Sequence, residues 1–384
     1  MIELKNLYKS YRGKSVLMNI SLTIQDNEFF VLIGSSGCGK TTLLKTLNKL
    51  NPIDKGEILI NGTPINRIKV TQLPRLMGYV VQEGGLFPHM TVEDNIALAM
   101  RVAGYPKEKI YDRITELLEL VNLEPDQYRS QYPSQLSGGQ RQRIGVARAF
   151  AADPEIILMD EPFSALDPMT RAELQDEVHR LQIRFHKTIV FVTHDMDEAV
   201  KLADRICILQ NGHVVQCDKP ENILKHPANE YINSFIGKNR LWENPSFIRA
   251  EDIMRPRPIT ISQSRTVVQA VQLMRHYNID SLLVTGDDNK FAGMVWLQDL
   301  IGIDQYSSPI SSFLSDDYLS VRVDDSLSTV LEKVADYGEK DFGILPVLDA
   351  EGAIRGFLNR SSLLSTLSRR FIDEPVERDE QEGA

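Results

Sequence analysis

The chain has 384 residues, of which 42% are hydrophobic and 25% are charged, which is typical of a globular protein with two or three domains. Its net charge of −10 disfavours nonspecific binding to nucleic acid, so we expect no nucleic-acid partner. No apolar run approaches the roughly 18 residues of a membrane span, and the N-terminus lacks the apolar core of a signal peptide.

Residues 1–237 alternate between strand-like and helix-like patterns. Short, β-branched, apolar runs bounded by polar residues predict buried strands at 28–34, 77–82, 155–161 and 187–194. Apolar spacings of three and four, with charged outer faces, predict helices at 106–123 and 168–186. Pro168 fits the first turn of the second helix. This alternation predicts an α/β domain with a largely parallel sheet.

A glycine-rich turn follows the first of these strands and leads into a helical pattern. Its residues match the GxxxxGK[ST] pattern of a P-loop: Gly34, Ser35, Ser36, Gly37, Cys38, Gly39, Lys40 and Thr41. Such a loop turns backbone N–H groups toward the β- and γ-phosphates of a nucleotide. Lys40 supplies a positive charge to the phosphate oxygens, and the Thr41 hydroxyl is a ligand for Mg²⁺. A glycine turn without a ligand is the alternative, and the complete pattern disfavours it.

Polar side chains follow the other predicted strands. Asp160 and Glu161 end the run at 155–161, where Asp160 suits the metal and Glu161 suits a general base that polarises the attacking water. His194 ends a further strand, where an imidazole can contact the γ-phosphate and orient the water. Gln82 follows the run at 77–82, and its amide can sense Mg²⁺ and the γ-phosphate.

A second glycine-rich turn, Ser137-Gly138-Gly139-Gln140, lies far along the chain from the P-loop. Ser137 is a natural N-cap, and the two glycines leave N–H groups unobstructed at the start of a helix. One nucleotide site does not need two phosphate loops. The residues alone therefore leave the purpose of the second turn open.

Taken in order, these motifs and Ser164-Ala165-Leu166-Asp167 resemble the nucleotide-binding domain of an ABC transporter over residues 1–237. The resemblance implies a P-loop NTPase fold with a parallel-sheet core, an antiparallel subdomain and a helical subdomain. It implies that the adenine of ATP stacks on Tyr11 and that residues 34–42, including Thr42, together with Gln82 contact the rest of the nucleotide. It also implies that Asp167 contacts ATP at a dimer interface. It also implies that Thr41, Gln82 and Asp160 hold Mg²⁺, and that Ser137–Gln140 of one subunit close over the partner's ATP. Residues 83–95 then face a coupling helix of a membrane subunit.

The C-terminal region contains an internal repeat. We expect a linker at 238–250, two similar domains at 251–308 and 309–372, and an acidic, disordered tail at 373–384. In the alignment of the two repeats, Ile259 corresponds to Leu319 and Val267 to Leu327. The later equivalences are Val284 with Val347, Gly293 with Gly356, and Leu300 with Leu363.

The two repeats resemble a tandem pair of cystathionine-β-synthase (CBS) domains, which bind adenine nucleotides or nucleotide second messengers. The ribose-binding pattern of that family is incomplete in both repeats, so a purely structural role in dimerisation is the alternative. The candidate ligand contacts are Asp299, Phe357 for adenine and Arg360 for phosphate, with cyclic di-AMP as the candidate ligand.

An ABC domain followed by a CBS pair resembles the ATP-binding subunit of quaternary-amine importers, which take up glycine betaine, carnitine or choline. The resemblance implies a homodimeric ATPase on the cytoplasmic face of the membrane, bound to a permease with a substrate-binding domain or protein. The cysteines show no metal-ligand spacing and are interpreted as reduced thiols: Cys38, Cys207 and Cys217. The alternatives are a soluble ABC-type ATPase and a nucleotide sensor without a transport role.

Overall fold

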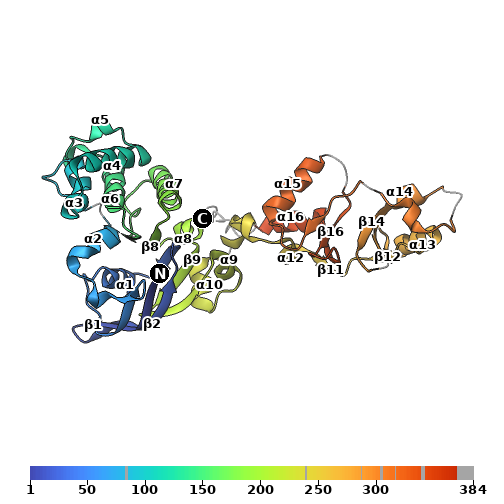
Figure 1. The fold of residues 1–384 in the computed structure, drawn as a ribbon. Helices are drawn as coiled ribbons and strands as arrows, with labels where there is room; N and C mark the ends of the chain where they lie inside the picture. Colours follow the sequence, from blue (N-terminus) through green and yellow to red (C-terminus); the bar gives the residue numbers. More distant parts are fainter. Residues whose placement is uncertain are drawn as a thin grey trace, which may run out of the picture. The chain divides into compact units, whose positions relative to one another are not determined.

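A computed structural model of the chain describes residues 1–82, 85–237, 240–286, 288–302, 306–315, 317–338 and 342–369. The chain divides into two compact units, Met1–Ile236 and Gly237–Ala384 (Figure 1). No helix within the described residues has the length and apolar character needed to cross a membrane. The tail predicted at 373–384 lies outside the described residues, as do residues 238–239 of the predicted linker.

The first unit contains two β-sheets. One has four strands in the order β2-β1-β4-β5, and the other has six in the order β10-β9-β3-β8-β7-β6. Their bounds are β1 (Ile2–Tyr11), β2 (Lys14–Ile24), β3 (Phe29–Ile33), β4 (Lys55–Ile60), β5 (Thr63–Pro64), β6 (Met77–Val80), β7 (Ile156–Asp160), β8 (Thr188–Thr193), β9 (Arg205–Gln210) and β10 (His213–Asp218).

All four strands predicted in this unit are confirmed, as β3, β6, β7 and β8. They pair in parallel, and β3, β7 and β8 are buried along their whole length, which explains their continuous apolar runs. Strand β10 pairs with β9 in the antiparallel sense. One core cluster joins residues of the antiparallel sheet, such as Ile2 and Leu17, to residues of the parallel strands, such as Leu32 and Leu158.

The helices of this unit lie in two groups. Figure 1 shows α3, α4, α5 and α6 together, away from α1 and the strands β1 and β2. The bounds are α1 (Lys40–Leu47), α2 (Leu73–Leu76), α3 (Val92–Val102), α4 (Lys107–Leu120), α5 (Pro125–Tyr128), α6 (Gly138–Phe150), α7 (Pro168–Phe185), α8 (Met196–Leu202), α9 (Pro220–Lys225) and α10 (Glu230–Ile236).

The two predicted amphipathic helices are confirmed as α4 and α7. Helix α4 buries Ile110, Ile114, Leu117 and Leu118, which recur at the helical spacing of the sequence pattern. Pro168 is the first residue of α7, and the Asp167 carboxylate caps the helix by accepting a hydrogen bond from the Thr170 N–H.

The second unit has a four-stranded sheet in the order β11-β17-β16-β15 and a three-stranded sheet in the order β12-β13-β14. Its strands are β11 (Arg255–Pro256), β12 (Thr260–Ser262), β13 (Ser281–Thr285), β14 (Phe291–Trp296), β15 (Val321–Arg322), β16 (Ile344–Leu348) and β17 (Ile354–Asn359). Its helices are α11 (Arg240–Glu243), α12 (Ala250–Ile253), α13 (Val267–Tyr277), α14 (Leu297–Leu300), α15 (Leu327–Tyr337) and α16 (Arg360–Arg369).

The predicted duplication is visible in the strand register. Val284 of β13 lies opposite Gly293 of β14, and Val347 of β16 lies opposite Gly356 of β17. Val267 and Leu327 begin the corresponding helices α13 and α15. Residues that the alignment of the repeats makes equivalent therefore occupy equivalent positions in the two halves.

The segment predicted as a linker is only partly one. Its early residues form α11, its last residue begins α12, and Ile248 and Ala250 are buried in the core that contains Leu345 and Val347. The sequence pattern did not predict this packing, because two apolar side chains among turn-forming and charged residues give no periodic pattern.

Candidate functional site

The P-loop joins β3 to α1 in a conformation that favours glycine. Gly34, Gly37 and Gly39 have φ angles of 154°, 77° and 112°. A Cβ atom at Gly34 would lie 2.2 Å from the Leu209 carbonyl oxygen, so the loop packs directly on β9. No side chain caps α1, which leaves the N–H groups of its first turn available to an anion.

Lys40 is 6% exposed, and its ammonium group folds back onto the loop. Its Nζ donates to the Gly34 carbonyl oxygen at 2.7 Å and to the Ser35 carbonyl oxygen at 3.2 Å. No carboxylate of the described residues forms an ion pair with it. A nearly buried positive charge held only by neutral carbonyls favours a bound anion, and phosphate oxygens fit this role.

The Thr41 side chain, at the start of α1, contacts Asp160 at the end of β7. The Thr41 hydroxyl donates to Asp160 Oδ1 at 2.8 Å, and the Tyr79 hydroxyl lies 3.4 Å from Asp160 Oδ2. Burial and the negative charge of Asp160 raise the pKa of Tyr79, so Tyr79 stays a hydrogen-bond donor. The sequence patterns did not indicate Tyr79. One hydroxyl and one carboxylate oxygen are the hard ligands that Mg²⁺ prefers, so these residues fit that ion.

Glu161, His194 and Gln82 form the other side of the site. Glu161 Oε2 lies 3.3 Å from His194 Nδ1 and 3.4 Å from Gln82 Nε2. Glu161 has φ 45°, a left-handed conformation that a glutamate rarely adopts, and its N–H donates to the Val192 carbonyl oxygen. This strained backbone turns the carboxylate out of the line of β7, as is common at functional sites.

A cavity of about 180 Å³ lies between these groups. It is lined by Val16, Ser36, Gly37, Gly39, Lys40, Thr41, Thr42 and Glu161. Tyr11 is not among the lining residues, but it pairs with Lys14 in the β1–β2 ladder, close to Val16, and its ring is 43% exposed. The cavity thus has a positive end at Lys40 and a carboxylate end at Glu161.

The second glycine turn is built as predicted but lies elsewhere. Ser137 Oγ accepts from the Gln140 N–H at 3.2 Å, and Gln140 Oε1 accepts from the Ser137 N–H at 2.9 Å. A Cβ atom at Gly139 would lie 2.7 Å from Thr170 Cγ2, whereas one at Gly138 would meet only the Arg141 guanidinium, at 4.0 Å. None of Ser137, Gly138, Gly139, Gln140 and Asp167 lines the described P-loop cavity.

A buried ion pair fixes the helix that this turn begins. The Arg143 guanidinium of α6 contacts Glu177 of α7, donates to the Val121 carbonyl oxygen at 3.0 Å and pairs with Glu173 at 2.8 Å. The Glu177 side chain is fully buried, and Asn122 also donates to it at 2.5 Å. The sequence patterns did not indicate this pair, because Arg143 and Glu177 lie in different helices.

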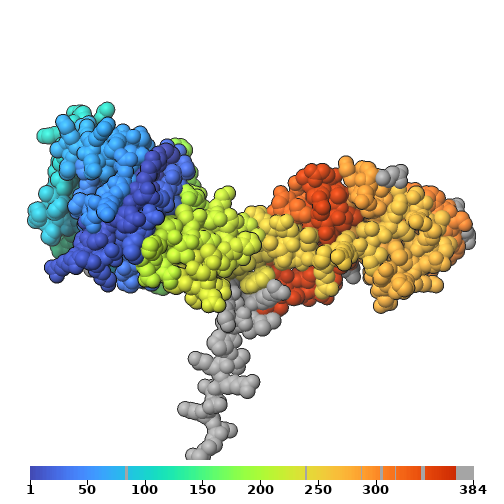
Figure 2. Space-filling view, turned by 90° about the horizontal axis from the view of Figure 1, so that it is seen from below, coloured from blue at the N-terminus to red at the C-terminus, as the bar shows by residue number. Residues whose placement is uncertain are grey.

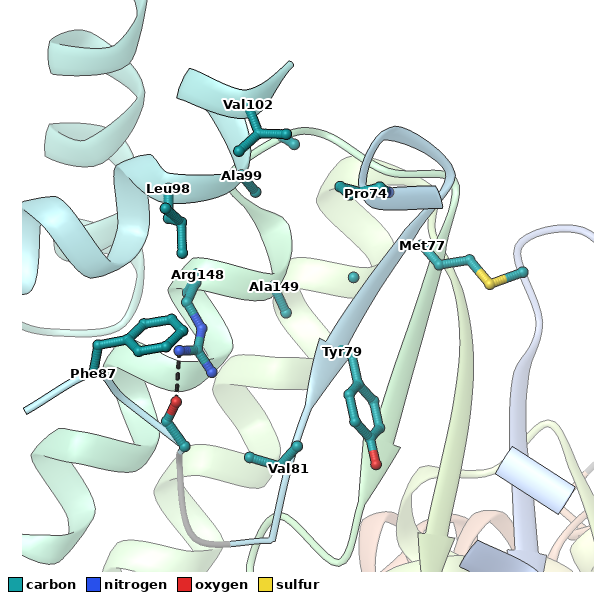
Figure 3. Close-up of a pocket in the computed structure, with 13 residues that line it drawn as sticks. Pro74, Met77, Tyr79, Val81, Phe87, Leu98, Ala99, Val102, Arg148 and Ala149 are labelled. Carbon is teal, nitrogen blue, oxygen red and sulfur yellow. Dashed lines mark hydrogen bonds between the residues drawn. The ribbon is translucent and has the colours of Figure 1, made fainter. Parts of the chain in front are cut away.

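An apolar groove lies beside the P-loop sheet (Figure 3). It has a volume of about 380 Å³ and lies between β6, the chain around Phe87 and the helices α3 and α6. Arg148 Nη1 donates to the Gly85 carbonyl oxygen at 2.8 Å, and burial lowers the pKa of Arg148. Other lining residues are Pro74, Met77, Tyr79, Val81, Leu98, Ala99, Val102 and Ala149. Residues 83 and 84 of the predicted coupling segment lie outside the described residues.

The structure does not bring the three candidate CBS contacts together. Asp299 lines a cavity of about 460 Å³ that also holds Asp280, Trp296, Asp317 and Tyr337. Neither Phe357 nor Arg360 lines it. The Arg360 guanidinium lies 5.6 Å from the centre of the Phe342 ring, and Phe357 of β17 pairs with Arg255 of β11. Asp299 therefore lies in an acidic cavity, apart from the contacts described for Phe357 and Arg360.

Comparisons with known proteins agree with this division of the chain. The family model described as "ABC transporter" matches residues 17–164, and the CBS domain model matches residues 250–304 and 310–369. The chain is 44% identical to the choline transport ATP-binding protein OpuBA of Bacillus subtilis, over 95% of each chain. It is 40% identical to the carnitine transport ATP-binding protein OpuCA of Listeria monocytogenes, over 95% of this chain and 91% of the relative.

Solved structures resemble the first unit. The dimeric ATP-binding cassette MJ0796 bound to ADP and phosphate matches with a TM-score of 0.53 and 33% identity, over 57% of this chain and 99% of that chain. CbiO1 of Clostridium perfringens matches in fold with a TM-score of 0.55 and 24% identity, over 59% of this chain and 91% of that chain.

Arg143→Met should destabilise the first unit by about 3–5 kcal/mol, because it leaves the Glu177 carboxylate buried without its cation. Adding Glu177→Leu should recover part of that loss, since no buried charge then remains unpaired. Urea unfolding of the whole chain, followed by a probe in the first unit, measures both. The matched control is Arg184→Met in the exposed pair with Glu116, which should cost less than about 1 kcal/mol. Equal losses for Arg143→Met and the control would contradict the role given to this pair.

Proposed function

This chain belongs to the ABC transporter ATP-binding proteins that carry a C-terminal CBS pair, and from that membership we propose that it hydrolyses ATP to drive import of a quaternary ammonium solute. One observation carries the proposal. The Lys40 ammonium, the Thr41–Asp160 pair and the strained Glu161 carboxylate lie around the P-loop cavity. The positive group, the hard oxygen ligands and the base are the three parts that phosphoryl transfer to water requires.

The residues around the P-loop cavity have separate roles in ATP hydrolysis. Lys40 and the free N–H groups of the P-loop bind the β- and γ-phosphates, and Tyr11 stacks on adenine. Thr41 and Asp160 would hold Mg²⁺ with Gln82 beside them, and the ion would supply positive charge to the phosphates. Glu161 accepts a proton from the attacking water as the water oxygen bonds to the γ-phosphorus, while the bond from that phosphorus to the β,γ-bridging oxygen breaks and ADP leaves. His194, whose Nδ1 lies 3.3 Å from Glu161 Oε2, is placed beside this carboxylate and orients it toward the water.

We infer that each working site is shared by two copies of the chain. Ser137–Gln140 form a capped helix start whose cap uses the N–H groups of Ser137 and Gln140 and leaves those of Gly138 and Gly139 to another acceptor, yet the segment does not line its own chain's cavity. A second copy in head-to-tail orientation supplies this turn to the γ-phosphate, with Asp167 at the interface. The dimeric form of the similar cassette MJ0796 supports this arrangement. The second glycine loop is then half of a site whose other half lies on the partner.

The apolar groove beside β6 is the proposed docking surface for the membrane permease. Phe87 and Val102 are 41% and 66% exposed at its edge, and exposed apolar side chains gathered in a groove indicate a partner. We propose that one apolar-faced helix of the permease occupies it, as helix-in-groove recognition requires. This contact places the chain on the cytoplasmic face of the membrane. A soluble ATPase role predicts no permease that co-purifies from solubilised membranes.

The solute class rests on the relatives. OpuBA is a choline transport protein, and OpuCA of Listeria monocytogenes is a carnitine transport protein. Both solutes are trimethylammonium compounds, so a compound of this kind is the proposed cargo, carried by a permease with its own substrate-binding domain or protein. Loss of uptake of one radiolabelled quaternary amine when this subunit is inactivated would identify the cargo.

The CBS pair is proposed to regulate the ATPase by binding a cyclic dinucleotide such as cyclic di-AMP beside Arg360 and Phe357. The basic Arg255 and Arg360 suit phosphate groups, whereas the aspartates around Asp299 repel them, so Asp299 is not part of this proposal. Cyclic di-AMP should bind the whole chain, and Arg360→Ala should weaken binding by about tenfold. Calorimetric titration measures both values, and an absence of heat with the unaltered chain would refute the proposal.

Glu161→Gln should retain ATP binding but lose hydrolysis by about 10²- to 10⁴-fold, because an amide cannot accept the proton of water. Lys40→Ala should instead lose ATP affinity, and both should abolish solute uptake. ATP binding, phosphate release and uptake of labelled quaternary amines separate these effects. Glu108→Gln, at an exposed position of α4, is the control and should match the unaltered protein. If the Glu161→Gln variant hydrolysed ATP as fast as the unaltered protein, Glu161 would not be the general base of the reaction.

Mixed dimers test the shared site. A Lys40→Ala subunit paired with a Gly138→Asp subunit has both lesions in one site and leaves the other intact, so about half of the turnover should remain. A subunit carrying both changes, paired with an unaltered one, has one lesion in each site and should be nearly inactive. A Cβ atom at Gly138 would meet only the flexible Arg141 guanidinium, at 4.0 Å, so the aspartate should fit without disturbing the chain's own fold. Equal activity of the two mixed dimers would mean that the site is not shared.

A further inference from the structure

The hairpin formed by β9 and β10 brings two cysteines opposite one another. Cys207 and Cys217 are direct partners in the antiparallel ladder. Cα atoms of such partners lie about 4.5–5.5 Å apart, which is within the range that a disulfide spans. The tight turn at Asn211–Gly212 alone would place Gln216 opposite Cys207, and a register shift between Val214 and Gln216 brings Cys217 there instead.

The two thiols differ in environment. Cys207 is fully buried, whereas Cys217 is partly exposed and packs against the same core cluster. The Arg205 guanidinium donates to Cys217 Sγ at 3.1 Å. A hydrogen bond from Cys207 and the charge of Arg205 lower the pKa of Cys217 despite its burial, and the same hydrogen bond and burial raise the pKa of Cys207. Cys217 therefore has the character of an attacking thiolate, and Cys207 that of a resolving thiol.

This hairpin supports the P-loop directly. Cys207 is the parallel partner of Leu32 in β3, the strand that leads into the loop. The Gly212 N–H donates to the Cys38 carbonyl oxygen at 3.2 Å, and Gly34 packs on the Leu209 carbonyl. In the space-filling view the N-terminal strands (blue) and the later part of the unit (yellow-green) share a continuous surface (Figure 2). A change in the hairpin is therefore transmitted to the loop that binds phosphate.

We propose that Cys217 and Cys207 are a peroxide-sensitive dithiol whose oxidation to a disulfide slows ATP hydrolysis at the adjacent P-loop. The Cys217 thiolate attacks one oxygen of hydrogen peroxide, the O–O bond breaks, and with one proton a water leaves and Cys217 sulfenic acid remains. Cys207 sulfur then bonds to Cys217 sulfur, and its proton leaves with the hydroxyl as a second water. The two thiols lose two electrons in total, and the peroxide gains them.

The P-loop thiol is a poor competitor in this reaction. Cys38 is 4% exposed, and burial raises its pKa, so it presents little thiolate to peroxide. The disulfide replaces a hydrogen-bond contact between the sulfurs by a covalent bond of about 2.05 Å with a restricted dihedral angle, so both side chains must change rotamer and the hairpin backbone must shift to accommodate that geometry. Because the Gly212 N–H donates a hydrogen bond to the Cys38 carbonyl oxygen, this shift of the hairpin moves the backbone of the phosphate-binding P-loop.

Hydrogen peroxide added to the reduced, full-length chain should produce the Cys207–Cys217 disulfide, detected by thiol alkylation and peptide mapping as a loss of about 2 Da from one peptide. ATPase activity should fall by about tenfold and return with dithiothreitol, since small displacements of positioning groups have effects of this size. Mass detection does not depend on the proposed ATPase function, and the reduced protein tests that function separately.

Cys217→Ser should form no disulfide and keep its own reduced ATPase rate after peroxide. In Cys207→Ala the reaction should stop at the sulfenic acid of Cys217, which dimedone traps. This variant is the second test if Cys217→Ser folds poorly. The proposal is overturned if the two cysteines do not link, if they link without a change in ATPase rate, or if Cys217→Ser loses activity as the unaltered protein does.

Discussion

The ammonium group of Lys40 is nearly buried, and within the part of the chain that the structure describes it bonds only the carbonyl oxygens of Gly34 and Ser35, so its charge is left for an anion to neutralise. The rest of the first unit is arranged around this requirement. The P-loop can fold closely around the lysine because glycines adopt positive φ angles there, and β9 supports the loop from behind. Without the tight backbone, the lysine would extend into water and lose its hold on phosphate.

The parallel sheet turns separate motifs into one site. Ile33 lies beside Thr193, and Asp160 lies beside Val192, so the residues that follow these strands emerge at the same edge. Glu161 and His194 thereby meet within hydrogen-bond distance although they are far apart in the sequence. Ligands of open α/β sheets bind at the carboxyl ends of the strands, and the P-loop cavity of this chain lies at that edge. The second glycine turn begins α6, and the ion pair between Arg143 and Glu177 fixes that helix against α7.

Much of this was predictable because it depends on short segments. The strands β3, β7 and β8 are continuous apolar runs, and Pro168 and Asp167 mark the start of α7 through local capping chemistry. Tyr79, by contrast, meets Asp160 through the pairing of β6 with β7, and no local pattern links the two residues. The packing of Ile248 and Ala250 escaped prediction for the same reason, since their partners lie about a hundred residues away.

The sequence by itself determined the P-loop, the capped turn at Ser137, the duplicated C-terminal region and the buried strands, because each depends on neighbours within a few residues. Tertiary structure decided the rest. It separated Asp299 from Phe357 and Arg360, it buried Glu177 against Arg143, and through one register shift it set Cys217 opposite Cys207. Which side chains share a site depends on strand register and helix packing, and these are fixed only when distant segments bury their apolar faces together.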